Sequence, residues 1–376
     1  MSKLGFSGYY GMSNYGDDLF AWVSALGSRH YWPEHEGILL GPRAIGAPGT
    51  YSSSFGWIPL ATYQRSDALG KIARLCTLLG GSLLLDKFIF SGGSLFHSRS
   101  SGIYDLLYKL GRARTTRFSA IGVSIGPFAD TATEKKTIES LRSFEYISVR
   151  DRASFDIAAS FALDVPLNYG GDLAGIYPMF DNAADLAGNK RPKLIGFSPC
   201  ALPGDPASAR MYCDFFVDQM SKLASERGYS ACLINLNQHS DSGDAELCAY
   251  TAAQLTAKSI PYALHSYQEL GVPKTWGLIS SLSAYMTVRL HGALTAFVTN
   301  TPFFLFEYHR KCTDFLEEIN HPLRGFEIPM HGDRSCDTDL LNCLLAGDSG
   351  AELSVVKYCA KSASNFTSAP WFDPRP

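Results

Sequence analysis

The chain has 376 residues, of which 46% are hydrophobic and 18% charged, and its formal net charge at pH 7 is -3. This length exceeds what one ordinary hydrophobic core organises, so we expect two domains, and the apolar content excludes a disordered chain. The balance of charges excludes a general electrostatic attraction to nucleic acid or anionic lipid.

The cysteines and the apolar runs indicate the compartment. Nine cysteines without a CxxC pair favour a reducing cytoplasm over a disulfide framework. The N-terminal stretch MSKLGFSGYYGMSNYGDDLF lacks the apolar core of a signal peptide. The longest apolar stretch, Leu78–Phe96, is interrupted by Asp86–Lys87 and Gly92–Gly93, so we expect no membrane span.

Short apolar runs alternate with helical patterns along the first half of the chain, which is typical of parallel sheets covered by crossover helices. In chain order, we expect a strand at Leu4–Tyr10, a helix from about Asp18, strands at Leu83–Phe90 and Phe118–Ser124, a helix at Thr133–Ser143, a strand at Tyr146–Arg150 and a helix at Arg152–Phe161. The polar stretch Asp181–Pro192 ends in proline and is the predicted linker.

The second half repeats the alternation. We expect a strand at Leu194–Ser198, a helix at Ala207–Arg227, a strand at Ser230–Asn235, a helix at Asp244–Lys258, a strand at Tyr285–Leu290, a helix at Gly292–Val298, a strand at Pro302–Glu307 and a helix at Cys312–Ile319. The predicted fold class is therefore α/β. Two Rossmann-like domains, residues 1–185 and 186–376, face each other across a cleft in a GT-B-like arrangement, with helices on both faces of each parallel sheet. One option for the C-terminal helix is to pack back on the first domain. Ligands are expected at the carboxyl ends of the strands.

The first loop, Gly8–Asp18 (GYYGMSNYGDD), follows a strand and opens a helix. Its glycines permit close approach of a ligand to the backbone, and Asp17 or Asp18 can cap the helix. Asn14 lies in the same loop and is a candidate substrate contact. The spacing is not GxGxxG, so a dinucleotide site is not indicated, and a capped turn without a ligand is the alternative.

Two further patterns follow predicted strands. Gly92 and Gly93 can form a floor beneath a ligand or only a turn. Arg150 and Arg152 stand where a strand meets a helix, and arginine suits a carboxylate or phosphate there through bidentate hydrogen bonds. The alternative is an Arg–Asp pair that holds the turn, and we expect one of the two arginines to form it.

The strongest pattern is Val288–Ala293 (VRLHGA). Arg289 and His291 are two residues apart at the end of a predicted strand, so both point to one face. Gly292 and Ala293 then open a helix whose free N–H groups favour an anion. A cation, a titratable group and a helix N-terminus are thus predicted to converge.

Two other loops border the same predicted crevice. Glu307 and Lys311 follow the next strand and are candidates for contact with a polar ligand, with a solvated loop as the alternative. His239, together with Asp241 or Asp244, is a candidate for holding sugar hydroxyls. The sequence contains no metal-ligand spacing, P-loop or GxSxG motif, so neither a metal nor a bound cofactor is expected.

Taken in order, these motifs resemble the polysaccharide pyruvyl transferase family. The resemblance rests on GYYGMSNYGDD, GGSLF, IGVSIGPF, ISVRDRAS, RLHGA and the segment Thr301–Lys311 before DFLEEI, and it extends from about residue 5 to residue 319. The chain has Gly92-Gly93-Ser94 where the family often has GGG, and Glu307–Arg310 where many members have a Ser-Tyr-Asp-Pro type run. Whether the 307–311 loop contacts donor or acceptor is therefore open.

The resemblance implies a GT-B-like fold and transfer of the enolpyruvyl group of phosphoenolpyruvate (PEP) onto two hydroxyls of a sugar, forming a cyclic ketal and releasing phosphate. The first domain is the expected acceptor side and the second domain the expected PEP donor side. In that reaction His291 is expected to be the general acid. Arg289, one of Arg150 or Arg152, and the N–H groups from Gly292 onward are expected to hold the anion. Asp17 or Asp18 is the suggested base.

The partners implied by the resemblance are PEP and a sugar acceptor, not nucleic acid. For an acceptor that is a lipid-linked repeat unit, the enzyme would work at the inner face of the cytoplasmic membrane without an anchor. Two alternatives remain open at this point, a GT-B glycosyltransferase that uses a nucleotide-sugar and a non-catalytic sugar- or anion-binding protein.

Overall fold

The computed structural model describes residues 2–42, 58–96, 116–180, 191–202, 204–239, 243–325, 340–347 and 350–374. The chain divides into two compact units. The first comprises Met1–Met12, Asp17–Phe180 and Tyr358–Pro376, and the second comprises Ser13–Gly16 and Asp181–Lys357. The predicted boundary at 185/186 lies in the part of the linker, residues 181–190, that falls outside the described residues.

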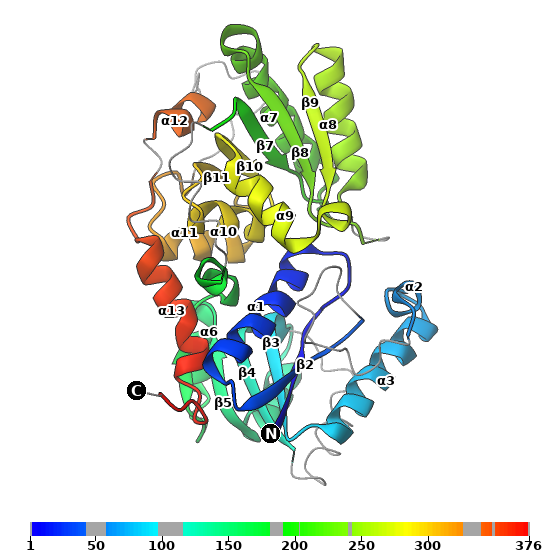
Figure 1. Cartoon of the computed structure of the whole chain (residues 1–376), viewed down its shortest axis with the longest axis vertical. Coiled ribbons are helices and arrows are strands. Elements are labelled where there is room, and N and C mark those ends of the chain that lie inside the picture. Colours follow the sequence, from blue (N-terminus) through cyan, green and yellow to red (C-terminus); the bar gives the residue numbers. More distant parts are fainter. Residues whose placement is uncertain are drawn as a thin grey trace. The chain divides into compact units, whose positions relative to one another are not determined.

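The first unit is built on a six-stranded parallel sheet with the strand order β2-β1-β3-β4-β5-β6 (Figure 1). Central strands such as β4 are buried along almost their whole length, which is why they read as continuous apolar runs. Its elements are β1 (Ser2–Ser7), α1 (Tyr15–Tyr31), β2 (His35–Leu40), α2 (Leu60–Tyr63), α3 (Ala68–Leu84), β3 (Lys87–Phe96), β4 (Arg117–Ile125), α5 (Thr131–Leu141), β5 (Phe144–Val149), α6 (Arg152–Ser160), β6 (Leu167–Tyr169) and the 3-10 helix η1 (Leu173–Met179).

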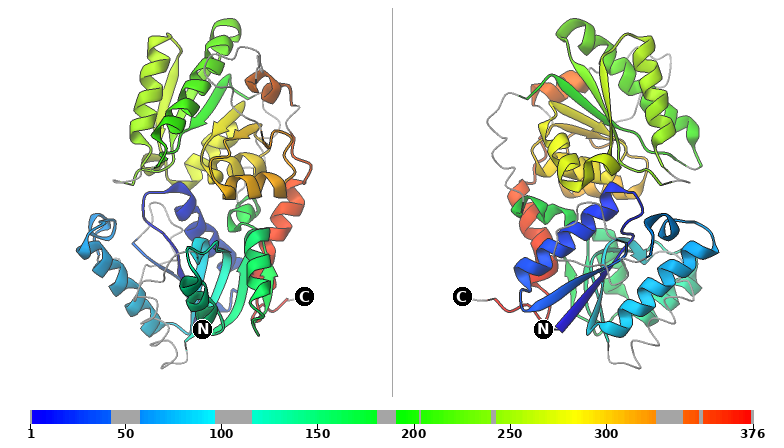
Figure 2. Two further views of the ribbon diagram at one scale, coloured as in Figure 1. Left: turned by 180° about the vertical axis from the view of Figure 1, so that it is seen from behind. Right: turned by 45° about the vertical axis from the view of Figure 1, so that its right-hand side comes forward.

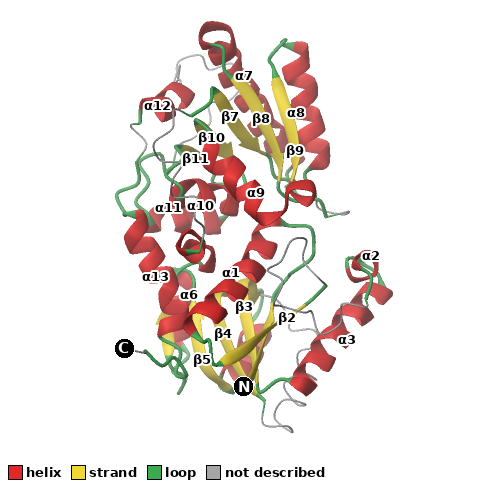
Figure 3. Ribbon diagram, in the orientation of Figure 1, coloured by secondary structure: helices red, strands yellow, loops and turns green. Residues whose placement is uncertain are grey.

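The second unit has a five-stranded parallel sheet with the order β11-β10-β7-β8-β9 (Figure 3). Its elements are β7 (Leu194–Ser198), α7 (Pro206–Arg227), β8 (Ser230–Asn235), α8 (Ala245–Ala257), β9 (Tyr262–Ser266), α9 (Tyr267–Ser281), β10 (Ala284–Thr287), α10 (Leu290–Val298), β11 (Phe303–Leu305), α11 (Arg310–Glu318), α12 (Leu340–Ala346) and α13 (Val355–Thr367), whose last residues from Tyr358 belong to the first unit.

The two sheets confirm the predicted fold class. Strands and helices alternate in both units, and the strands of each sheet run in parallel, as the views in Figure 2 also show. Parallel neighbours require crossover connections, and helices supply most of those that lie within the described residues. Such sheets place their loops, and so their candidate ligand contacts, at the carboxyl ends of the strands.

Several predicted boundaries are wrong, and three of them lie at candidate site residues. Strand β3 runs to Phe96 and not only to Phe90, because Gly93 and Phe96 still pair with β4. Gly92 and Gly93 adopt left-handed φ values of 73° and 81° inside the strand, and the register against β4 shifts between Gly93 and Phe96. Helix α1 begins at Tyr15 and not near Asp18. Strand β10 ends at Thr287, and the chain is already helical from Leu290.

Several elements were not predicted from the sequence, among them β2, α3, β9 and α9. Helix α9 is kinked at Gly271, where φ is 71°, and it contains Pro273. These two residues interrupt the pattern by which a helix is predicted from sequence. Strand β9 lies at the edge of its sheet, and its first three residues are exposed. Only Leu85 and Asp86 separate α3 from β3, so the end of the helix was included in the strand predicted at Leu83–Phe90.

Helix α13 is held to the first unit through one buried amide. The Asn365 side-chain oxygen accepts hydrogen bonds from the Gly122 amide at 2.9 Å and from the Ser148 hydroxyl at 2.7 Å. Its nitrogen donates to the carbonyls of Gly170 at 3.0 Å, Gly171 at 3.1 Å and Ser362 at 2.9 Å. One side chain thus satisfies backbone groups from three segments far apart in the sequence.

No helix in the described ranges is both long and apolar enough to cross a membrane. The cysteines that the structure describes are free thiols, and most of them are buried. Burial raises the pKa of buried thiols such as Cys213, to about 11, and Cys232, to about 12. These two behave as small apolar side chains.

Replacing Asn365 with alanine is expected to destabilise the first unit by about 3 kcal/mol, because several buried polar groups lose their partner together. Urea unfolding of Asn365→Ala measures this effect. Lys357→Ala, an exposed change on the same helix, is the matched control and should fall within about 0.5 kcal/mol of the wild type. Equal stability of the two variants would contradict the anchoring role.

His321 makes the second unit sensitive to acid. It is 1% exposed and packs on the Phe303 ring at 4.6 Å, and burial lowers its pKa from 6.5 to about 4, against a smaller opposing effect of Glu307. The unfolded chain binds a proton on the His321 imidazole more tightly than the folded chain does. The contribution of His321 to the unfolding free energy is therefore fully present above pH 6.5 and is lost as the pH falls toward 4.

Between pH 7.5 and pH 5 this loss amounts to about 2 kcal/mol. The unfolding free energy of the wild type should therefore fall by about that much more than the unfolding free energy of His321→Gln over the same interval. Parallel pH profiles for the two proteins would show that His321 does not carry the effect.

Candidate functional site

Arg289 lies between the end of β10 at Thr287 and the start of α10 at Leu290, and much of its guanidinium is engaged within the protein. The strand geometry that predicted one shared face for Arg289 and His291 is absent here, because the chain is helical from Leu290 onward. The Nε and Nη2 atoms of Arg289 donate to the two carboxylate oxygens of Asp244 at 2.8 and 2.5 Å. The Asp244 side chain is fully buried, and that of Arg289 is 16% exposed. Burial works to lower the pKa of Arg289, but the neighbouring carboxylate outweighs burial and raises it, so the guanidinium stays charged.

Asp244 connects three strand ends of the second unit. Besides binding Arg289, its Oδ1 accepts the amide N–H of Ala201 at 2.8 Å, after β7. Its own amide donates to the Asn237 carbonyl at 2.8 Å, after β8. The sequence suggested Asp244 as a companion of His239 for sugar hydroxyls. In the structure its carboxylate is committed to Arg289 and Ala201 instead.

His291 lies in the first turn of α10 and is half-buried. Its ring packs against the backbone of Gly16, where a Cβ would lie 2.0 Å from the imidazole Nδ1. Glycine is therefore required at position 16 by the histidine ring. The loop motif and the RLHGA motif, 275 positions apart, meet at this contact.

No side chain caps the N-terminus of α10. Gly292 is needed there for packing, since a Cβ would lie 2.8 Å from the Tyr285 hydroxyl and 2.9 Å from that of Thr287. Ala293 is buried behind it. Uncapped N–H groups beside Arg289 give this end of the helix a positive potential that suits an anion.

The first loop contributes residues to both units. Asn14 pairs with Asn237 in an isolated bridge, and its side-chain oxygen accepts the Gly16 amide at 3.1 Å, which caps α1. The predicted caps have other positions. Asp18 is buried and accepts the Gly11 amide at 2.6 Å, and Asp17 lies half-buried in the first turn of α1.

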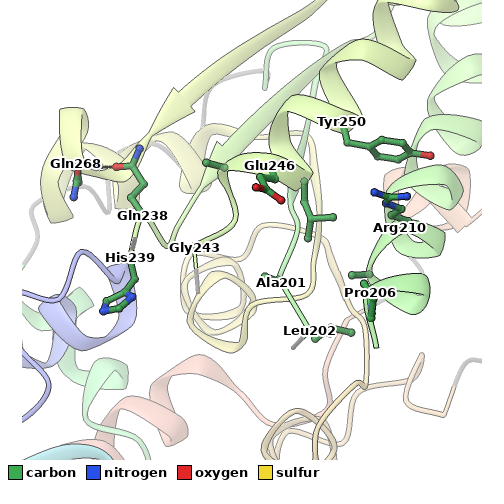
Figure 4. A pocket seen from close by; sticks show the side chains of 13 residues that line it. Ala201, Leu202, Pro206, Arg210, Gln238, His239, Gly243, Glu246, Tyr250 and Gln268 are labelled. Carbon is green, nitrogen blue, oxygen red and sulfur yellow. Dashed lines mark hydrogen bonds between the residues drawn. The ribbon is translucent and has the colours of Figure 1, made fainter. Parts of the chain in front are cut away.

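His239 follows β8 and lines a cavity of about 690 Å³ together with Gln238 and Gln268 (Figure 4). The His239 amide donates to the Asn237 side-chain oxygen at 3.2 Å, which fixes the backbone of this loop. Asp241, its other suggested companion, lies outside the described residues.

Glu307 and Lys311 flank the segment after β11. The Glu307 carboxylate accepts the Gly325 amide and so holds a neighbouring turn. The Lys311 ammonium lies 5.7 Å from the centroid of the Tyr308 ring. Burial raises the pKa of Cys200, near the same tyrosine, so this thiol is protonated at neutral pH.

In the first unit, Arg150 is 7% exposed and forms the centre of a polar cluster at the strand ends. Its Nε donates to the Ser124 hydroxyl at 2.6 Å and its Nη2 to that of Ser94 at 3.0 Å, while Asp172 lies 3.6 Å from Nη1. Arg152 is exposed and pairs with Asp156 one turn along α6, at 2.9 Å.

The two glycines of β3 serve packing. A Cβ on Gly92 would lie 2.4 Å from the Phe20 ring of α1, so helix and strand approach there closely. Gly93 has more space, with Phe20 at 4.0 Å, but its φ of 81° favours glycine. Their role as the floor of a ligand site stays a prediction.

Sequence reasoning missed the polar residues that fix this end of the second unit, above all Asn237 and Gln268. Gln268 donates to the Ser13 hydroxyl, and Tyr15 bonds Thr295 at 2.9 Å. Only the position of Asn237 after a strand pointed to it, and α9, which carries Gln268, was not predicted. Across the described ranges, no group of three or more His, Cys, Asp or Glu side chains is arranged to hold a metal ion.

The fold is similar to that of solved UDP-N-acetylglucosamine 2-epimerases. One such structure is 9% identical with a TM-score of 0.56, covering 97% of this chain and 93% of that chain. The enzyme from Neisseria meningitidis, solved with UDP-GlcNAc bound, is 8% identical with a TM-score of 0.55, covering 96% and 94%. At these identities the likeness shows the GT-B-like fold alone. No curated protein matches the chain.

The sequence itself assigns the family. The family model described as polysaccharide pyruvyl transferase matches residues 14–310, which is well over half of the chain. The match begins at Asn14 in the first loop and includes Arg289 and His291. It extends over both units. The chain therefore belongs to the polysaccharide pyruvyl transferase family.

Proposed function

We propose that the protein transfers the enolpyruvyl group of PEP onto two hydroxyls of a sugar in a polysaccharide or its lipid-linked repeat unit, forming a cyclic ketal and releasing phosphate. The family match makes the chain a transferase that acts on polysaccharides. The observation that carries the finer proposal is the placement of Arg289 and His291 at the uncapped start of α10.

Arg289 and the N–H groups of α10 supply the positive potential that PEP requires. The bonds to Asp244 use Nε and Nη2 and not Nη1, the third guanidinium nitrogen. Nη1 and the first N–H groups of α10 would bind the phosphate or the carboxylate of PEP. Asp244 fixes the direction of the guanidinium, so little freedom is lost on binding.

His291 would act as the general acid. It gives a proton to the methylene carbon of PEP, and C2 becomes electrophilic. A sugar hydroxyl attacks C2 and loses its proton, the C2–O bond to phosphate breaks, and a second hydroxyl of the same sugar closes the ketal with loss of its proton. Three protons move in this sequence, one from His291 and one from each sugar hydroxyl. The His291 proton remains in the new methyl group, and the departing phosphate takes one of the two hydroxyl protons. The other hydroxyl proton restores His291.

The competing function is nucleotide-sugar transfer, because a cation at a helix N-terminus would hold a diphosphate as well as PEP. Ligand-induced stabilisation separates the two functions, since only the true donor raises the melting temperature at concentrations near its Kd. The family implies a polysaccharide acceptor, and an association with the membrane surface is part of the same proposal.

PEP is expected to raise the melting temperature by a few degrees at about 100 times its Kd, and UDP- and GDP-sugars are expected to have no effect. Arg289→Gln alone leaves the Asp244 carboxylate buried without its partner, at a cost of about 3 to 5 kcal/mol. The double variant Asp244→Asn/Arg289→Gln removes both charges, folds more stably than the single variant and should lose the response to PEP. An unchanged PEP response in the double variant, or a response to nucleotide-sugars only, contradicts the proposal.

His291→Gln preserves the approximate size of the side chain beside Gly16 and removes the acid. We expect kcat for phosphate release from PEP in the presence of acceptor to fall about 100-fold or more, with the PEP-induced melting shift retained. His30→Gln, at an exposed histidine of α1, is the control. Turnover close to the wild-type value in His291→Gln would refute the acid role.

A further inference from the structure

The cavity of about 690 Å³ in the second unit is not explained by the chemistry at α10. Its lining residues follow β7 and β8, begin α7 and α8, and include Gln268 just after β9 (Figure 4). It therefore lies at the carboxyl ends of these strands, where α/β proteins bind ligands. Its volume is within the range of small-molecule sites.

One wall of the cavity combines charge with an aromatic ring. Figure 4 shows Glu246, from the first turn of α8, directed into the space between α8 and Arg210 of α7. The Arg210 guanidinium lies 5.6 Å from the centroid of the Tyr250 ring. The Tyr250 hydroxyl donates to Asp214 at 2.7 Å, which fixes the ring in place.

The opposite wall presents an amide. The Gln238 side-chain oxygen accepts hydrogen bonds from the Ser266 hydroxyl at 2.7 Å and from the backbone N–H of Gln268 at 3.3 Å. These bonds fix the orientation of the group, and its nitrogen remains as a donor on the other side (Figure 4). The cavity thus holds an acceptor at Glu246 and donors at Arg210 and Gln238.

This set of groups matches a neutral, polyhydroxylated ring. Neighbouring hydroxyls donate to a carboxylate and accept from a guanidinium or an amide, and an aromatic ring packs on the apolar face of a pyranose. A purely anionic ligand fits less well, because Glu246 would repel it at the start of α8. An apolar ligand would leave these polar groups without partners.

We propose that this cavity binds a saccharide ring of the acceptor, with Glu246, Arg210, Tyr250 and Gln238 as its contacts. The inference rests on the proposed function for the identity of that ring. Asp244, which binds Arg289, stands between Gly243 and Ala245 of the cavity lining. Asp244 therefore lies next to both proposed sites, and the second unit contributes to both.

Saturation-transfer NMR tests the site without PEP. The probes are the methyl glycosides of glucose, galactose, mannose and N-acetylglucosamine, together with lactose and cellobiose, and uridine serves as the rival. At least one saccharide should receive saturation from the wild type and from Glu226→Gln, an exposed glutamate at the far end of α7. The signal should fall at least tenfold in Glu246→Gln and in Arg210→Gln.

Melting curves with PEP on the same variants separate this proposal from the proposed function. Glu246→Gln should keep the full PEP response, so loss of saccharide binding with PEP binding intact supports the cavity as a separate site. If PEP does not raise the melting temperature of the wild type, but the wild type binds a saccharide and Glu246→Gln does not, only the proposed function is overturned. Saturation of no probe, equal saturation in Glu246→Gln and Glu226→Gln, or Glu246-dependent binding of uridine alone overturns the saccharide site.

Discussion

The second unit depends on one buried ion pair, Asp244 with Arg289. A carboxylate and a guanidinium out of water are stable only when paired and fully hydrogen-bonded, and here the bidentate geometry and the Ala201 amide meet that requirement. In meeting it, the pair fixes the ends of β7, β8 and β10 and the starts of α8 and α10 relative to one another. The positive end of α10 and the wall of the cavity are consequences of the same contact.

Much of the fold followed from the sequence, because alternation of apolar strands and amphipathic helices is a local signal. The parallel sheets could be predicted because strands joined through helices pair in parallel. The failures came where local signals conflict with tertiary packing. Gly92 and Gly93 indicate a turn in isolation, whereas pairing with β4 on both sides of Gly92 keeps them inside β3.

The candidate site was predictable in its position but not in its partners. The position of Arg289 and His291 near the start of a helix could be predicted, because the sequence shows the end of a strand followed by glycine. Arg289 pairs with Asp244, 45 residues away, across two different loops. No pattern in either loop indicates this pairing. Arg150 illustrates the same limit, since its hydroxyl partners Ser94 and Ser124 come from two different strands.

The path of the chain also has a meaning for protein dissection. The chain changes from one unit to the other at four places, after Met12, Gly16, Phe180 and Lys357. Neither unit is encoded by a continuous stretch of the gene. A fragment ending at Phe180 would lack Asn365 and expose the amide of Gly122 and the carbonyls of Gly170 and Gly171. During synthesis the first unit therefore cannot be completed until Asn365 has left the ribosome.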